Sequence, residues 1–144
     1  MKIKNVDIKK SVSLIKKMCG SIKPVAYMIS GSGQKKIAES FEAVGMLPFS
    51  RLPGFEKPMV KGHSGKLLLC RYKKNHFLIQ CGRSHLYEKG SMNDVTFPVF
   101  LVKQLGLKRL LLLNSAGAVR KSLKKGDMTP NHSLWLKDFH QSIY

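Results

Sequence analysis

The sequence predicts an α/β domain, because short apolar runs that are typical of buried strands alternate with stretches of helix-forming composition. Two of the runs, Val25–Ile29 and Leu107–Leu113, each lead into a turn of small residues. The chain of 144 residues is long enough for one domain of this kind and too short for two.

An amphipathic helix is expected at the N-terminus. Four apolar side chains recur at helical spacing and share one face: Ile8, Val12, Ile15 and Cys19. Lysines fill the opposite face, which we expect to be solvated, and Gly20 is expected to end the helix.

The first apolar run, Val25–Ile29, predicts a buried strand. It passes into Ser30–Gly33, and Gln34–Val44 then has the composition of a helix. A strand, a small-residue turn and a helix suit a bound anion, because N–H groups at a helix start have no internal partners.

A hairpin is expected in the middle of the chain. The turn-rich segment Pro48–Gly65 is predicted to be an extended loop. Leu67–Tyr72 and Phe77–Cys81 are apolar and flank four polar residues, which indicates two strands joined by a turn. Gly82–Gly90 is another polar loop.

The next helix is predicted to begin with Asn93 as its N-cap and to run to about Leu105. Pro98 would be tolerated in its first turn, and Gly106 would end it.

Leu107–Leu113 is the most hydrophobic run, and we expect it to be a central strand. It leads into Asn114–Gly117, a second turn of small residues.

The charge is strongly basic, with 26 Lys and Arg against 8 Asp and Glu and a formal net charge of +18. An excess of this size suggests nucleic-acid binding. The charges are mostly lysines, however, and are scattered in pairs with no long basic arm. We therefore favour a solvated surface over a polyanion site.

The cysteines Cys19, Cys70 and Cys81 have neither close pairing nor metal-ligand spacing. We expect reduced, buried thiols, with no disulfide framework, metal site or cofactor. No signal-peptide pattern follows Met1–Lys10, and no apolar run has the length of a membrane span, so we expect a soluble, cytoplasmic protein.

Three loops concentrate groups that could bind phosphate: Gly31–Gly33, Gly82–Glu88 and Asn114–Gly117. Together they supply a hydroxyl, backbone N–H donors, a guanidinium and an imidazole. Two of them follow predicted core strands at their carboxyl ends, where α/β sheets collect ligands. A phosphate dianion needs several donors and at least one fixed positive charge.

Taken singly, each loop has a simpler interpretation. Gly-Ser-Gly after a strand is most often a tight turn, and Gln34–Lys36 lacks the third glycine of a dinucleotide fingerprint. Arg83 and His85 would by default be solvated.

The order and spacing of seven blocks resemble the trimeric purine nucleoside phosphorylases over about Pro24–Met128. The blocks are Gly31–Gly33, Leu52–Phe55, Val60–Gly65, Gln80–Glu88, Val95–Val99, Asn114–Gly117 and Gly126–Asp127. The resemblance implies a phosphorylase/hydrolase-like α/β fold in which helices flank a mixed β-sheet. It also implies cleavage of purine nucleosides by inorganic phosphate, the co-substrate, to free base and ribose 1-phosphate.

The resemblance assigns site residues position by position. Those that match phosphate-binding positions are Ser32, His63, Arg83, His85 and Ser115. Tyr87 and Ala116 match positions at the nucleoside. Glu88 matches an acidic residue that orders the phosphate loop, and with His85 it is a candidate catalytic residue.

The chemistry agrees with that assignment. The transition state should resemble an oxocarbenium ion, and phosphate held below the anomeric carbon would be both nucleophile and counter-charge. Arg83 would supply a fixed cation, and His85 and His63 would donate to phosphate oxygens.

The match ends near Met128. The family's base-binding glutamate and asparagine and its second phosphate-contacting serine lie in a C-terminal half that the chain lacks. Thr129–Tyr144 departs from the family pattern, which suggests a frameshift or truncation, although a diverged but functional cap is the alternative. We therefore expect one partial domain over residues 1–144, family-like at 24–128 and with an aberrant tail at 129–144.

Smaller departures and rival functions remain. Gln34, Ser115 and Ala118 differ from the family pattern, which affects the substrate assignment more than the phosphate assignment.

We expect a poorly stable chain with weak or no activity and with exposed apolar sheet edges. The alternatives are a methylthioadenosine phosphorylase, a basic nucleic-acid-binding module, and a non-catalytic partner of a longer phosphorylase. The family forms homotrimers, an assembly that the missing half puts in question.

Overall fold

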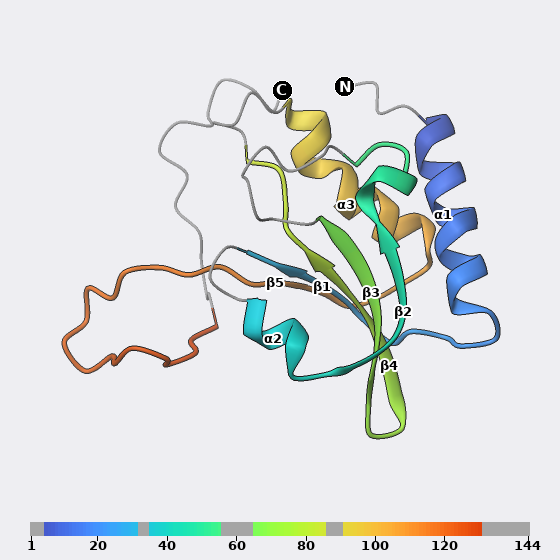
Figure 1. Cartoon of the computed structure of the whole chain (residues 1–144). Coiled ribbons are helices and arrows are strands. Elements are labelled where there is room, and N and C mark those ends of the chain that lie inside the picture. The colour runs from blue at the N-terminus through green and yellow to red at the C-terminus, as the bar shows by residue number, and fades with distance from the viewer. Residues whose placement is uncertain (1–4, 32–34, 56–64, 86–90, 131–144) are drawn as a thin grey trace.

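The computed structural model describes residues 5–31, 35–55, 65–85 and 91–130. Within them a five-stranded sheet has the strand order β2-β3-β4-β1-β5, with helices on both faces (Figure 1). The elements are α1 (Asn5–Cys19), β1 (Tyr27–Ser30), α2 (Lys35–Glu39), β2 (Glu42–Pro48), η1 (Phe49–Arg51), β3 (Lys66–Tyr72), β4 (Asn75–Cys81), α3 (Met92–Gln104) and β5 (Leu110–Leu112). β1 runs parallel to β4 and β5, whereas β2, β3 and β4 pair antiparallel. The expected α/β class with a mixed sheet is confirmed.

Helix α1 forms as its spacing predicts. Ile8, Ile15 and Cys19 are buried, and Val12 is half-buried against the same core. Gly20 then adopts φ +57° and donates to the carbonyl of Lys16 at 3.0 Å, which ends the helix with a left-handed residue that glycine favours.

Two clusters of buried side chains line the two faces of the sheet. The larger one joins the sheet to α1 and α3, and its members include Ile15, Tyr27, Leu69 and Leu101. The smaller one joins the sheet to α2: Ala38, Leu68, Cys70 and Ile79. Alternation along β3 and β4 sends successive side chains to opposite faces, so the middle of these two strands is buried on both sides of the sheet.

The block Leu52–Phe55 belongs to the larger core. Buried Ser11 of α1 donates to the carbonyl of Pro53 at 2.7 Å. An added Cβ at Gly54 would overlap the ring of Phe97. The hydrogen bond from Ser11 attaches this loop to α1, and the absence of a side chain at Gly54 lets the loop pack closely against α3. The role of Leu52–Phe55 in the structure is therefore packing.

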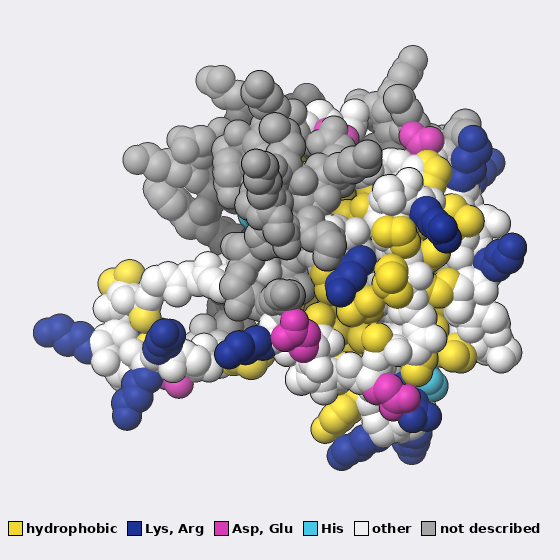
Figure 2. Space-filling view, in the orientation of Figure 1, with side chains coloured by type: hydrophobic (Ala, Val, Ile, Leu, Met, Phe, Trp, Pro, Cys, Tyr) yellow, Lys and Arg dark blue, Asp and Glu magenta, His cyan; other side chains and the backbone are white. Residues whose placement is uncertain are grey.

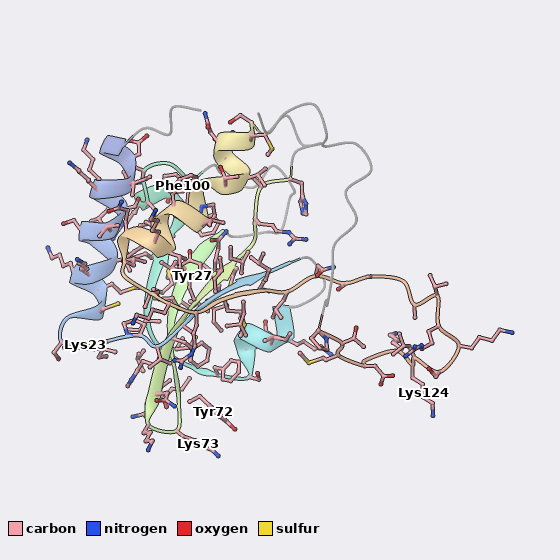
Figure 3. All side chains as sticks on the ribbon, turned by 180° about the vertical axis from the view of Figure 1, so that it is seen from behind. Lys23, Tyr27, Tyr72, Lys73, Phe100 and Lys124 are labelled. Carbon is pink, nitrogen blue, oxygen red and sulfur yellow. The ribbon has the colours of Figure 1, made fainter. Side chains whose placement is uncertain are left out.

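The predicted hairpin is confirmed. β3 and β4 pair along their whole lengths and leave only Lys73 and Lys74 in the turn, where Lys73 has φ 53°. Figure 3 shows Lys73 at the tip of the hairpin. The strands are longer than expected, because Asn75 and His76 pair with Tyr72 and Arg71.

The predicted helix over Gln34–Val44 is wrong in its second half. Helix α2 ends at Glu39, and β2 begins at Glu42 and pairs with β3 through an irregularity between Ala43 and Gly45. Pairing with the open side of β3 outweighs a helical propensity that is only a weak local preference. β2 continues to Pro48 and is followed directly by η1. The first residues of the loop expected over 48–65 therefore belong to a strand and a 3-10 helix.

The start of α3 also differs from the prediction. Its N-cap is Ser91, not Asn93: Asp94 N–H donates to the Ser91 side chain, and the Asp94 carboxylate accepts from Ser91 N–H at 2.7 Å. Pro98 therefore lies inside the helix, where it is buried. The expected stop is confirmed, with Gly106 at φ +75°.

The expectation of a central strand over Leu107–Leu113 is wrong for the part of the chain that the structure describes. β5 is short and lies at the sheet edge, paired only with β1. Leu111 is 41% exposed and Leu112 60%. Residues 114–130 leave the body as a long excursion, and Figure 3 places Lys124 at its far end.

Candidate functional site

The carboxyl ends of three strands lie at one edge of the sheet. β1 lies between β4 and β5 and runs parallel to both, with Ser30 opposite Cys81 and Ile29 opposite Leu112. The N–H of Leu113 donates to the carbonyl of Ile29 at 2.9 Å, which extends this register past β5. The turns after β1, β4 and β5 therefore start side by side, in the position where open α/β sheets bind ligands.

The first of these turns leaves little room for a side chain at Gly31, because two neighbours lie close to it. A Cβ added at Gly31 would lie 3.1 Å from the carbonyl oxygen of Leu113 and 3.6 Å from a terminal guanidinium nitrogen of Arg83. Gly31 therefore lies close to both Arg83 and the Leu113 carbonyl, which immediately precedes the third predicted loop.

One donor of the Arg83 guanidinium has no acceptor among the described residues. Its Nε atom is buried and has no hydrogen-bond partner within the described segments. A buried N–H without an acceptor costs about 1–3 kcal/mol, and more for a charged group. A fixed cation with such a donor at the carboxyl edge of a sheet is suited to an anion.

A buried polar chain supports the turn that carries Arg83. Tyr27 and Gln80 are 0% and 1% exposed, and the Tyr27 hydroxyl donates to Gln80 Oε1 at 2.9 Å. Gln80 Nε2 donates to the carbonyl of Gly82, also at 2.9 Å, and Gly82 has φ +100°. Burial, with a smaller contribution from Cys81, raises the pKa of the Tyr27 phenol, so it stays a donor at neutral pH.

Some of the other predicted site residues can be located. His85 is half-buried two residues beyond Arg83, whereas Ser115 and Ala116 are exposed just beyond Leu113. Ser32, His63, Tyr87 and Glu88 lie outside the described residues.

Sequence reasoning missed Tyr27 and Gln80. The available signal was a glutamine inside the apolar run Phe77–Cys81, since a polar side chain in a buried strand must find partners.

The three cysteines are poorly suited to act as nucleophiles. Cys19 and Cys70 are buried, Cys81 is half-buried, and all three are free thiols. Burial raises the pKa of all three, to about 11 for Cys70, which disfavours a thiolate nucleophile.

The described segments contain neither a metal-binding cluster nor a membrane-spanning helix. Within them no group of three or more His, Cys, Asp or Glu could hold a metal ion. No helix in those segments is long and apolar enough to span a membrane.

Comparison with known proteins identifies the family of the chain. The family model described as the phosphorylase superfamily matches residues 28–129. Purine nucleoside phosphorylase 1 of Geobacillus stearothermophilus is 36% identical over 105 residues, which are 73% of this chain and 38% of that protein. The protein of the same name from Bacillus subtilis is also 36% identical over 105 residues, and 39% of it is covered.

A solved structure agrees in fold. Schistosoma mansoni purine nucleoside phosphorylase in complex with inosine superposes with a TM-score of 0.73 and 34% identity. The match covers 88% of this chain and 44% of that one. The chain therefore spans about two fifths of the length of the relatives that it matches.

Proposed function

The chain belongs to the phosphorylase superfamily, and we propose that it forms the phosphate-binding part of a purine nucleoside phosphorylase. The observation that carries the proposal is the contact of Arg83 with the turn at Gly31, beside the carbonyl of Leu113, together with its unpartnered Nε. The names of the relatives supply the substrate class, a purine nucleoside.

In the proposed reaction a phosphate oxygen attacks the anomeric carbon of the ribose while the bond from that carbon to the purine nitrogen breaks. The electron pair of that bond leaves with the purine, which takes up a proton, and ribose 1-phosphate remains. Arg83 would hold the dianion below the sugar and balance its charge. Because positioning and electrostatics provide most of the rate, a rigid phosphate site is the central requirement.

The remaining predicted residues complete the proposal. Ser32, His63, His85 and the backbone at Ser115 would donate to phosphate. Tyr87 and Ala116 would contact the nucleoside, and Glu88 and His85 would act in catalysis. No cofactor is needed. A homotrimer and a cytoplasmic location belong to the same proposal.

The 144-residue polypeptide is expected to turn over nucleosides weakly. None of the site residues assigned above is expected to hydrogen-bond the purine base. A methylthioadenosine phosphorylase would share the phosphate site, and comparing inosine with methylthioadenosine as substrates separates the two. A basic nucleic-acid module is not favoured by the visible face in Figure 2, where the Lys and Arg side chains of the described residues are scattered.

Calorimetric titration of the purified chain with inorganic phosphate tests the proposal. Replacing Arg83 with alanine should weaken binding by roughly 10- to 100-fold, the value of a lost charged hydrogen bond. Arg71→Ala is the matched control, because Arg71 lies exposed at the other end of the hairpin and pairs with Glu42 at 2.6 Å. Equal phosphate affinity in the wild type and Arg83→Ala, or no binding by the wild type, would refute the proposal.

A further inference from the structure

A buried glutamine lies directly behind the candidate phosphate site. Gln80 faces the larger core, opposite Ile29 in the register of β4 and β1. An amide in such surroundings is costly unless both its ends are hydrogen-bonded, and here both are.

The direction of each hydrogen bond is fixed. The carbonyl of Gly82 can only accept, so the Gln80 NH₂ group must face it, and the Gln80 oxygen is left for Tyr27. Tyr27 must then donate, and burial keeps its phenol protonated. The network therefore has one arrangement, and Tyr27 anchors it in the larger core.

This arrangement acts on the peptide unit that precedes Arg83. The carbonyl of Gly82 and the N–H of Arg83 belong to one planar trans group, so a bond to the first orients the second. Gly82 N–H is held from the other side by the carbonyl of Ser30 at 3.4 Å. The backbone of the turn is thus fixed on both sides of Gly82, at the step where the chain enters Arg83.

From this geometry we propose that Gln80, anchored by Tyr27, is a positioning residue that sets phosphate affinity through Arg83. The inference rests on the proposed function, because it assigns to Gln80 the orientation of that site's cation. Gln80 itself would not contact phosphate. Its two hydrogen bonds point to the phenol and to the Gly82 carbonyl, both on the protein side.

A double-mutant cycle on phosphate binding tests the coupling. Gln80→Met keeps the side-chain length and removes both polar ends, and it should weaken phosphate binding by about five- to tenfold. Placed on Arg83→Ala, the same change should alter affinity by less than about twofold, because the group it positions is gone. Equal factors in both backgrounds, or no effect in either, would overturn the proposal.

Two further variants protect the test against a simple folding defect. Gln104→Met makes the same substitution on the exposed end of α3 and should change nothing. Tyr27→Phe removes a single oxygen and should weaken phosphate binding by about two- to threefold, since Gln80 keeps its bond to Gly82. A Tyr27→Phe protein that folds and binds phosphate like the wild type would contradict the anchoring role.

A second readout separates this inference from the proposed function. In ¹⁵N spectra recorded without phosphate, Gln80→Met should shift the Arg83 Nε–H resonance, whereas Gln104→Met should leave it in place. If the wild type binds no phosphate, the proposed function fails, and the spectrum recorded without phosphate becomes the test of whether Gln80 positions Arg83. An unchanged Arg83 resonance in Gln80→Met would then reject the positioning role.

Discussion

The turn after β4 and the turn after β5 border the same candidate site but are held very differently. Gly82 is hydrogen-bonded to Ser30 and Gln80, and Arg83 lies against Gly31. The residues that follow β5 are exposed from Asn114 to Arg120, and an added Cβ at Gly117 would meet nothing within 4 Å. One side of the site is therefore built into the core, and the other depends on little packing within the described chain.

This contrast separates two properties of a binding site. The position of the cation follows from buried contacts and should persist in the isolated chain. The position of the third turn beyond Leu113 should be easier to displace, because its residues are exposed.

The packed body should be sensitive to truncation of a core side chain. Leu101 is 0% exposed and belongs to the larger core, so Leu101→Ala should lower the free energy of unfolding by about 3–4 kcal/mol. Val119 is 99% exposed, and Val119→Ala should change it by less than about 0.5 kcal/mol. Urea denaturation measures both, and equal losses would show that the excursion is packed as well as the body.

A glycine-to-valine substitution should be costly in the turn after β1 and nearly neutral in the segment after β5. Gly31→Val would press a branched side chain against the Leu113 carbonyl and the Arg83 guanidinium, so we expect a loss of about 2–3 kcal/mol and impaired phosphate binding. Gly117→Val meets open space and should be nearly neutral. A tolerated Gly31→Val would mean that the turns are not in contact.

Alkaline pH should destabilise the packed sheet. The pKa of Cys70 rises from 9.0 to about 11 on burial, so the unfolded chain loses that proton first. The contribution of the protonated Cys70 thiol to the free energy of unfolding is fully present below pH 9. It is lost as the pH rises towards 11, by on the order of 2 kcal/mol. Denaturation curves at several pH values measure the slope, which Cys70→Ala should reduce; an unchanged slope would assign it to other groups.

The exposed edge should affect association more than stability. Leu112→Lys adds a charge to an exposed edge strand, so the free energy of unfolding should change by less than about 0.5 kcal/mol while aggregation falls. Light scattering at increasing protein concentration measures this, with Val119→Lys as the control. A strongly destabilised Leu112→Lys protein would show that the outer side of β5 is already covered.

Local patterns predicted the elements whose signals are local. The spacing of Ile8 and Ile15 defined α1, and the polar turn between two apolar runs defined the β3–β4 hairpin. They failed where pairing decides the outcome. Glu42–Pro48 is a strand because β3 offers a partner, and the apolar run Leu107–Leu113 lies at an edge because of the order of the strands.

The candidate site divides in the same way. Arg83 was identified from its motif, whereas Tyr27 and Gln80 act through contacts between β1 and β4 that no sequence spacing encodes. The capping of α3 shows a related limit, since Ser91 and Asn93 are both suitable N-cap residues. The reciprocal bonds between Ser91 and Asp94 decide between them.

The most direct test of the account is to follow the Arg83 Nε–H resonance while phosphate is added to the ¹⁵N-labelled chain. We predict a saturable downfield shift of that resonance with the affinity measured by calorimetry, because phosphate supplies the acceptor that the described protein does not. An Arg83 resonance that stays constant up to high phosphate concentration, whether or not phosphate binds elsewhere, would contradict the account.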